Sequence, residues 1–158
     1  MTQLNKKWEK AGYQPVVFCR GDYSQVELMG LHRLAQFCIV SSLHDGMNLV
    51  AKEFVASRFD EDGVLILSSF TGAARELTNA LLINPFSTDE MSDAIYRALT
   101  MPAEERSRRM QRLRAATAEN NVYRWAGKIL STLLKIDLPE TANDPEKRRV
   151  WELTGVLP

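Results

Sequence analysis

Apolar residues gather in four short runs along the first half of the chain, and polar or turn-forming residues bound each run. Short runs that are rich in β-branched and aromatic residues are typical of buried β-strands. The pattern therefore predicts strands over residues 15–21, 37–42, 63–69 and 80–85.

Segments with helical periodicity lie between and after these runs. Ser24 and Glu27 have the spacing of a capping box, which predicts that a helix begins at Ser24. Strands that alternate with helices predict a parallel sheet with crossover helices, so the fold class is α/β. The other predicted helical segments are 48–57, 70–78, 87–100 and 102–135, the last with a break at 120–121.

The 158 residues suit one domain, with 45% apolar and 25% charged residues, as in soluble globular proteins. Lys plus Arg and Asp plus Glu both number 20, so no net charge attracts nucleic acid. No run is long enough to cross a membrane, and the first residues do not form a signal peptide. We expect a cytoplasmic protein with a domain over 1–136 and a linker and tail over 137–158.

Cys19 and Cys38 both lie in predicted strands, so we expect two buried free thiols in a reducing cytosol. No cluster of histidine, cysteine and carboxylate residues suggests a metal site.

The helix over 48–57 is apolar around most of its circumference, which predicts a buried helix. Glu53 lies within it, and a buried carboxylate needs a partner. That partner is either an arginine elsewhere in the fold or the hydroxyl groups of a ligand.

The loop over 43–47 follows a predicted strand, and ligands of parallel sheets bind at the carboxyl ends of strands. The free N–H groups of the helix that begins near Asn48 can bind phosphate oxygens. Gly46 permits a close backbone approach, and the carboxylate of Asp45 can accept hydrogen bonds from hydroxyl groups.

Three stretches of the chain, in this order, carry a resemblance to a known family. They are "YSQVEL", "DGMNLVAKEFVA" and "GVLILSSFTGAARELTNALLINPFSTDEMSDAIYRALTMPAEER". From about Trp8 to Leu130 the chain resembles the carboxy-terminal part of the trehalose-6-phosphate synthases, retaining glycosyltransferases of family 20. The resemblance implies part of a Rossmann-like domain, the second of two, which binds the donor UDP-glucose. It implies no metal and no cofactor beyond this nucleotide-sugar substrate.

The resemblance also implies a role for each position of the loop and helix. Asp45, the candidate catalytic residue, contacts the hydroxyl groups of the donor sugar, and Glu53 binds the ribose hydroxyls. The other substrate-binding residues are Gly46, Met47 and Asn48 along the glucose, and Leu49 and Val50 at the diphosphate.

Some features of the family are absent. His44 stands where the family has arginine, and we expect it to be a bystander. The first domain, which holds glucose 6-phosphate, is missing, as are the opening strand and its phosphate-neutralising Arg and Lys. We therefore expect an inactive fragment or truncated product. It should self-associate through an uncovered sheet edge and an apolar stripe around Trp125, or be only marginally stable.

Alternatives remain at several points. The acceptor could be glycerol 3-phosphate, as in the related glucosylglycerol-phosphate synthases, or the chain could be a non-catalytic module that binds a sugar nucleotide or a partner. The turn over 69–74 could approach a phosphate, or it could be a plain cap with close helix packing. The arginine-rich run over 106–114 is interpreted as a solvated helix face.

Overall fold

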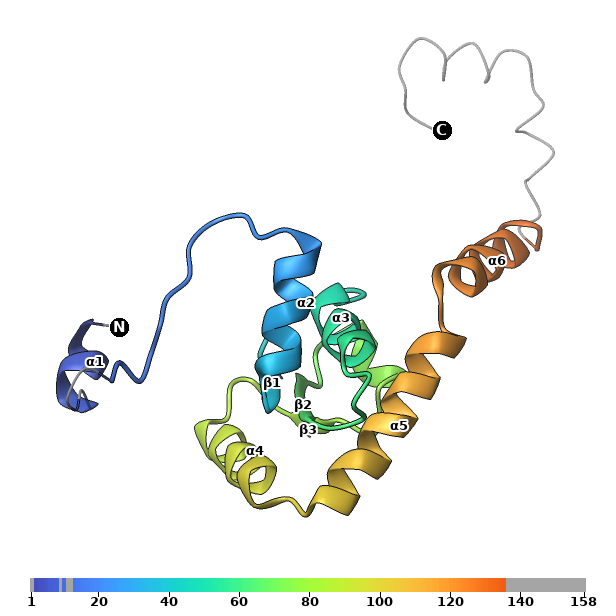
Figure 1. The fold of residues 1–158 in the computed structure, drawn as a ribbon. Helices are drawn as coiled ribbons and strands as arrows, with labels where there is room; N and C mark the ends of the chain where they lie inside the picture. Colours follow the sequence, from blue (N-terminus) through green and yellow to red (C-terminus); the bar gives the residue numbers. More distant parts are fainter. Residues whose placement is uncertain (1, 9, 11–12, 136–158) are drawn as a thin grey trace, which may run out of the picture.

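Three parallel strands form the centre of the computed structural model, which describes residues 2–8, 10 and 13–135 (Figure 1). Their order is β1 (Phe37–Val40), β2 (Val64–Ser68) and β3 (Leu81–Ile83). This sheet and its flanking helices confirm the predicted α/β class. The predicted tail over 137–158 lies outside the described residues.

The central strand β2 is buried along its whole length, because helices cover both faces of the sheet. Leu65 and Leu67 pack against α3 (Leu49–Ser57) and α5 (Ala103–Glu119) on one face. Val64 and Ile66 pack against α4 (Thr88–Thr100) on the other face. An α/β/α sandwich of this kind needs a central strand that is apolar on both sides, as β2 is.

The predicted helix boundaries agree with the caps in the structure. Ser24 and Glu27 form the predicted capping box at the start of α2 (Gln25–Leu34). Asn121 caps α6 (Val122–Leu133) and separates it from α5, which confirms the break in the last helical stretch. The predicted short helix within 70–78 is the 3-10 turn η1 (Gly72–Arg75).

The prediction of a strand over 15–21 is wrong. These residues form no ladder with any described strand, and the side chains of Val17 and Phe18 are 72% and 56% exposed. Asn5 of α1 (Thr2–Trp8) binds the backbone of Val16 through hydrogen bonds of 2.8 and 3.0 Å. A β-prone run needs a neighbouring strand for its hydrogen bonds, and this segment arches away from the sheet (Figure 1).

The expectation that both cysteine thiols are buried is wrong for Cys19 and only partly correct for Cys38. Cys19 is exposed because its segment is not in the sheet. Cys38 is half-buried in β1, and this burial raises the pKa of its thiol to about 11. The Cys38 thiol therefore stays protonated at neutral pH and is a poor nucleophile.

Arg58 ties the end of α2 to the end of α3. Its Nη1 donates hydrogen bonds to the carbonyl oxygens of His32, Arg33 and Ala35 at 3.2, 2.8 and 2.6 Å. Its Nε donates to the carbonyl oxygen of Asp62 at 2.7 Å. The buried guanidinium thus satisfies carbonyl groups at the end of a helix, which would otherwise lack partners.

Replacing Arg58 should destabilise the whole domain. We expect Arg58→Met to lower the free energy of unfolding by about 2–4 kcal/mol, because buried carbonyl groups lose their donor. Urea denaturation followed by circular dichroism measures this change. The control is Arg112→Met at an exposed position of α5, and equal stability of the two variants would contradict the assignment.

Candidate functional site

The loop between β1 and α3 is fixed to the segment that follows β2. The Asp45 N–H donates to the carbonyl oxygen of Phe70 at 3.3 Å. The Gly72 N–H donates to the carbonyl oxygens of Asp45 and Gly46 at 3.2 and 2.7 Å. These contacts, with the parallel bridge between Asp45 and Thr71, extend the β1–β2 pairing past the carboxyl ends of the strands.

Gly72 is required by this close approach. A Cβ atom at Gly72 would lie 2.3 Å from the carbonyl oxygen of Gly46, which is far inside van der Waals contact. A Cβ atom at Gly46 would meet no atom within 4 Å. The glycine of "TGAAREL" therefore serves the close backbone packing of the two loops.

Asp45 and Asn48 together build the start of α3. Asn48 adopts a left-handed backbone with φ 52°, and its Oδ1 accepts a hydrogen bond from the Ala51 N–H at 3.0 Å. Its Nδ2 donates to Oδ2 of Asp45 at 2.6 Å. Oδ1 of Asp45 accepts no hydrogen bond from a described residue, so half of this carboxylate is available to a ligand. The N–H groups of Leu49 and Val50 belong to the first helical turn, which has no intrahelical acceptor.

The prediction that α3 is buried nearly all round is wrong. Ala51, Phe54 and Val55 are 0% exposed and face the core. Leu49 and Val50 are 59% and 50% exposed, because no described element covers this side of the helix.

Glu53 lies on the same exposed face of α3. Its carboxylate forms no hydrogen bond or ion pair with any residue in the described part of the chain. The predicted burial of Glu53 is therefore wrong. Of the two partners that we considered for it, an arginine is not found among the described residues, and the hydroxyl groups of a ligand remain a prediction. Glu53 also lines a groove of about 200 Å³ between α2 and α3. The other lining residues are Gln25, Leu28, Met29, His32, Ala56, Ser57 and Phe59.

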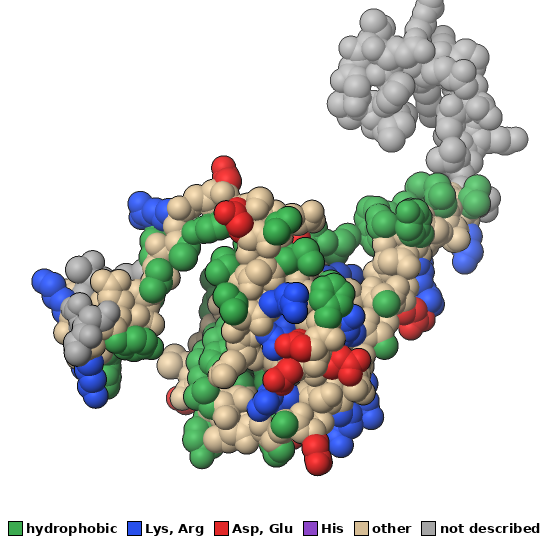
Figure 2. Space-filling view, in the orientation of Figure 1, with side chains coloured by type: hydrophobic (Ala, Val, Ile, Leu, Met, Phe, Trp, Pro, Cys, Tyr) green, Lys and Arg blue, Asp and Glu red, His purple; other side chains and the backbone are tan. Residues whose placement is uncertain are grey.

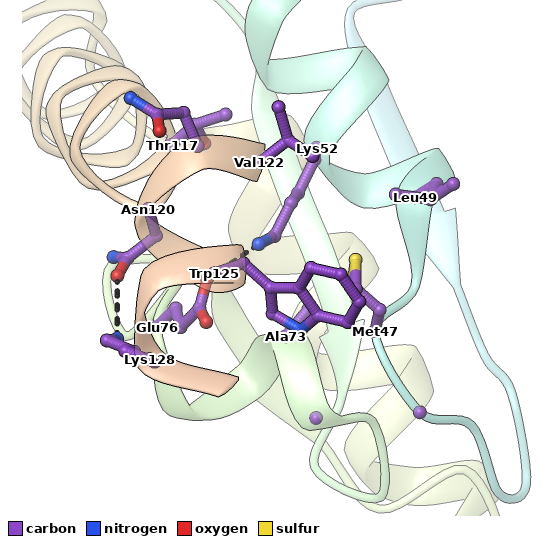
Figure 3. Close-up of a pocket in the computed structure, with 13 residues that line it drawn as sticks. Met47, Leu49, Lys52, Ala73, Glu76, Thr117, Asn120, Val122, Trp125 and Lys128 are labelled. Atoms are coloured by element: carbon purple, nitrogen blue, oxygen red, sulfur yellow. Dashed lines mark hydrogen bonds and ion pairs between the residues drawn. The ribbon is translucent and has the colours of Figure 1, made fainter. Parts of the chain in front are cut away.

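A larger cavity of about 760 Å³ adjoins the other side of the loop (Figure 3). Gly46, Met47 and Leu49 border it, and Trp125 of α6 points into it. At its floor Nζ of Lys52 lies 2.7 Å from Oε2 of Glu76. The sequence analysis did not predict this ion pair, because Lys52 and Glu76 lie 24 positions apart in the chain.

The apolar stripe on α6 is not part of the core. Val122, Trp125, Ile129 and Leu133 are 66%, 50%, 39% and 56% exposed, and α6 stands off from the sheet (Figure 1). The expectation that part of this stripe lacks a cover is confirmed.

Three arginines of the run over 106–114 form internal ties. Arg106 pairs with Asp62 at 2.7 Å, and this hydrogen bond holds the pKa of the Asp62 carboxyl below its usual range. Arg109 pairs with Glu105 at 2.7 Å, and Arg114 donates to carbonyl oxygens at the end of α3. Arg108 and Arg112 are exposed, as expected for a solvated helix face. The other three arginines attach the helix to the rest of the domain.

Among the described residues, no group of three or more histidine, cysteine or carboxylate side chains could hold a metal ion. None of the helices over these residues is both long and apolar enough to cross a membrane.

The close approach at Gly72 can be tested with a matched pair of glycine variants. We expect Gly72→Ala to lower the free energy of unfolding by about 1–3 kcal/mol, because the added methyl group separates the two loops. Gly46→Ala should leave stability nearly unchanged, since its Cβ enters open space. Thermal melts of both variants measure the difference, and equal melting temperatures would refute the packing role.

The chain is similar to known proteins over most of its length. The family model of glycosyltransferase family 20 matches residues 1–135. The trehalose-6-phosphate synthase of Salmonella typhimurium strain LT2 is 37% identical over 148 residues, which are 93% of this chain and 30% of the relative. The synthase of Sodalis glossinidius is 42% identical over 135 residues, which are 85% of this chain and 29% of the relative.

Two solved structures show the same fold. The E. coli protein bound with UDP-2-fluoro glucose has a TM-score of 0.80 and 38% identity, over 85% of this chain and 30% of that chain. The Burkholderia xenovorans trehalose-phosphate synthase in complex with glucose-6-phosphate has a TM-score of 0.80 and 39% identity, over 84% and 30%. The chain thus spans about 30% of the length of the curated relatives it matches first. With a family model that matches residues 1–135 of 158, this chain belongs to glycosyltransferase family 20.

Proposed function

We propose that this chain is the donor-binding part of a retaining glycosyltransferase that makes trehalose 6-phosphate from UDP-glucose and glucose 6-phosphate. The observation that carries the proposal is the exposed face of α3. This face combines two apolar residues, a free helix start and the carboxylate of Glu53, which pairs with no described residue. Apolar side chains at exposed positions beside unsatisfied polar groups are a common property of ligand sites.

Each group on this face suits one part of a nucleotide sugar. The N–H groups of Leu49 and Val50 and the positive end of the α3 dipole favour the diphosphate. The carboxylate of Glu53 suits the two ribose hydroxyls, and the adjoining groove suits a planar ring. Oδ1 of Asp45, which accepts no hydrogen bond from a described residue, suits the hydroxyl groups of the glucose.

Residues 46–48 complete the sugar side of the proposed site. Gly46 and Met47 border open space beside the loop, and the Asn48 amide holds the Asp45 carboxylate in place. We assign no metal and no further cofactor to this site. Stabilisation of the diphosphate leaving group by oriented N–H donors is the chemistry that these residues offer.

The relatives support the substrates that we propose. One solved relative is named with a UDP-glucose analogue and another with glucose-6-phosphate. This chain spans about 30% of their length, and we propose that it supplies one wall of the site. We propose that glucose 6-phosphate is held by the part of the enzyme that this chain does not span. Free thiols at Cys19 and Cys38 agree with a cytoplasmic location.

Titration of the 158-residue chain with UDP and UDP-glucose tests the site. We expect weak binding, with a dissociation constant on the order of 1 mM (about −4 kcal/mol), because a single wall leaves the ligand partly solvated. Amide chemical shifts should change over residues 45–53. We also expect no UDP release when glucose 6-phosphate is added to the isolated chain with UDP-glucose. Shift changes confined to other regions would contradict the assignment, and rapid turnover would contradict the one-wall interpretation.

A single variant separates ligand binding from structure at Glu53. We expect Glu53→Gln to weaken UDP binding by about 1–3 kcal/mol, because a charged acceptor of ribose hydroxyls becomes neutral. Its melting temperature should not change, since Glu53 is exposed and unpaired within the described residues. Glu104→Gln, at an exposed position of α5, is the control. A lower melting temperature with unchanged UDP binding would assign Glu53 a structural role.

A further inference from the structure

The ion pair between Lys52 and Glu76 is the only ion pair among the described residues that involves a side chain of α3. Nζ of Lys52 donates a hydrogen bond of 2.7 Å to Oε2 of Glu76, and Figure 3 shows the two side chains pointing toward each other. Lys52 forms no other side-chain hydrogen bond with a described residue. The pair therefore links one point of α3 to one point of the segment that follows β2.

This link is the second of two links between the same segments. At the start of η1, the Gly72 N–H donates to the carbonyl oxygen of Gly46 at 2.7 Å. Glu76 directly follows the end of η1 and holds Lys52 on α3. The start of α3 thus lies between a backbone contact on the loop and an ion pair on the helix. One contact alone would allow the helix start to pivot, whereas two contacts at different points restrict that rotation.

Lys52 lies on the same strip of the helix as the N-cap residue Asn48. Four positions separate the two residues, so they lie near the same face of α3. The side chain of Asn48 accepts a hydrogen bond from the Ala51 N–H at 3.0 Å and donates one to Oδ2 of Asp45 at 2.6 Å. A rotation of α3 that moved Lys52 would therefore also move the amide that orients the Asp45 carboxylate.

The surroundings of the pair suit a positioning role better than a role in stability. The side chains of Lys52 and Glu76 are 15% and 35% exposed. Ion pairs between partly exposed side chains contribute little to the free energy of unfolding, and the buried ring of Phe54 already attaches α3 to the core. The carboxylate of Glu76 also neutralises the charge of Lys52, which makes this lysine a weak candidate for direct contact with a phosphate group.

We propose that Lys52 and Glu76 are positioning residues of the proposed donor site. Their ion pair holds α3 in the rotation at which Asn48 keeps the Asp45 carboxylate in place and the N–H groups of the first turn face the ligand. The effect on ligand binding rests on the proposed function. The effect on the start of the helix requires no ligand, so it can be measured separately.

NMR of the full 158-residue chain tests the proposal with Lys52→Met and Glu76→Gln. Each variant removes one charge and nearly keeps the size of the side chain. Without ligand, we expect both variants to shift the Ala51 amide and the side-chain amide of Asn48, and the Ala51 amide to exchange faster with solvent. We expect UDP binding to weaken roughly 3- to 10-fold in each variant, as for residues that act through one network. The melting temperature should stay close to that of the unchanged chain.

A double variant that exchanges the charges gives a test by rescue. Lys52→Glu combined with Glu76→Lys rebuilds the ion pair with the opposite polarity. It should return the two amide signals and the UDP affinity toward those of the unchanged chain. The control is Glu119→Gln, which removes an exposed ion pair with Arg124 and should change neither the signals nor the affinity. If the double variant does not fold, the two single variants decide the question.

Three results would overturn the proposal. Unchanged amide signals at Asn48 and Ala51 in both single variants would show that the pair does not hold the start of α3. Weaker UDP binding in Lys52→Met alone would assign Lys52 to direct contact with phosphate. A lower melting temperature in both variants, with unchanged UDP binding, would assign the pair to stability. Absence of UDP-induced shifts over 45–53 in the unchanged chain would instead contradict the proposed function, and the ligand-free signals would still show whether the pair positions the helix.

Discussion

The backbone contact between the Gly72 N–H and the Gly46 carbonyl oxygen, at 2.7 Å, is the constraint on which the proposed site depends. It joins the loops that follow two neighbouring parallel strands, and only glycine at position 72 allows that distance. The loop cannot move along the sheet without losing this contact and the bridge at Asp45. The carboxylate, the helix start and the exposed face of α3 are therefore positioned by main-chain geometry, before any ligand arrives.

Packing in the core fixes the orientation of α3. Phe54 and Val55 are 0% exposed, and burial of such side chains contributes about 1.5–3 kcal/mol each. This burial fixes the rotation of the helix, so the opposite face must point outward with Glu53. The Lys52–Glu76 ion pair acts in the same direction, because it joins α3 to the turn that contains Gly72. Core packing and site geometry are thus set by the same helix.

Local features of the sequence were sufficient to predict most elements. The capping box at Ser24 and the paired asparagines before α6 act through hydrogen bonds within a few residues. The strand predicted over 15–21 failed because a strand depends on a neighbour that local sequence does not specify. Periodicity also predicted the wrong burial for Glu53, because the sequence does not show whether the apolar residues beside it on α3 are buried or exposed. Gly72 was noticed as part of a small-residue turn, but its contact with Gly46 joins residues 26 positions apart.

The exposed apolar side chains of β1 and α6 lie at the periphery of the molecule, outside its packed core. β2 is buried on both faces, with a packed cluster on each side of the sheet. The edge of β1 that pairs with no described strand and the exposed stripe of α6 lie at different sides of this core (Figure 1). Covering either surface adds contacts at the rim without rearranging β2 or the loop at Gly72. The ligand binding that we propose at the exposed face of α3 therefore needs no rearrangement of this core.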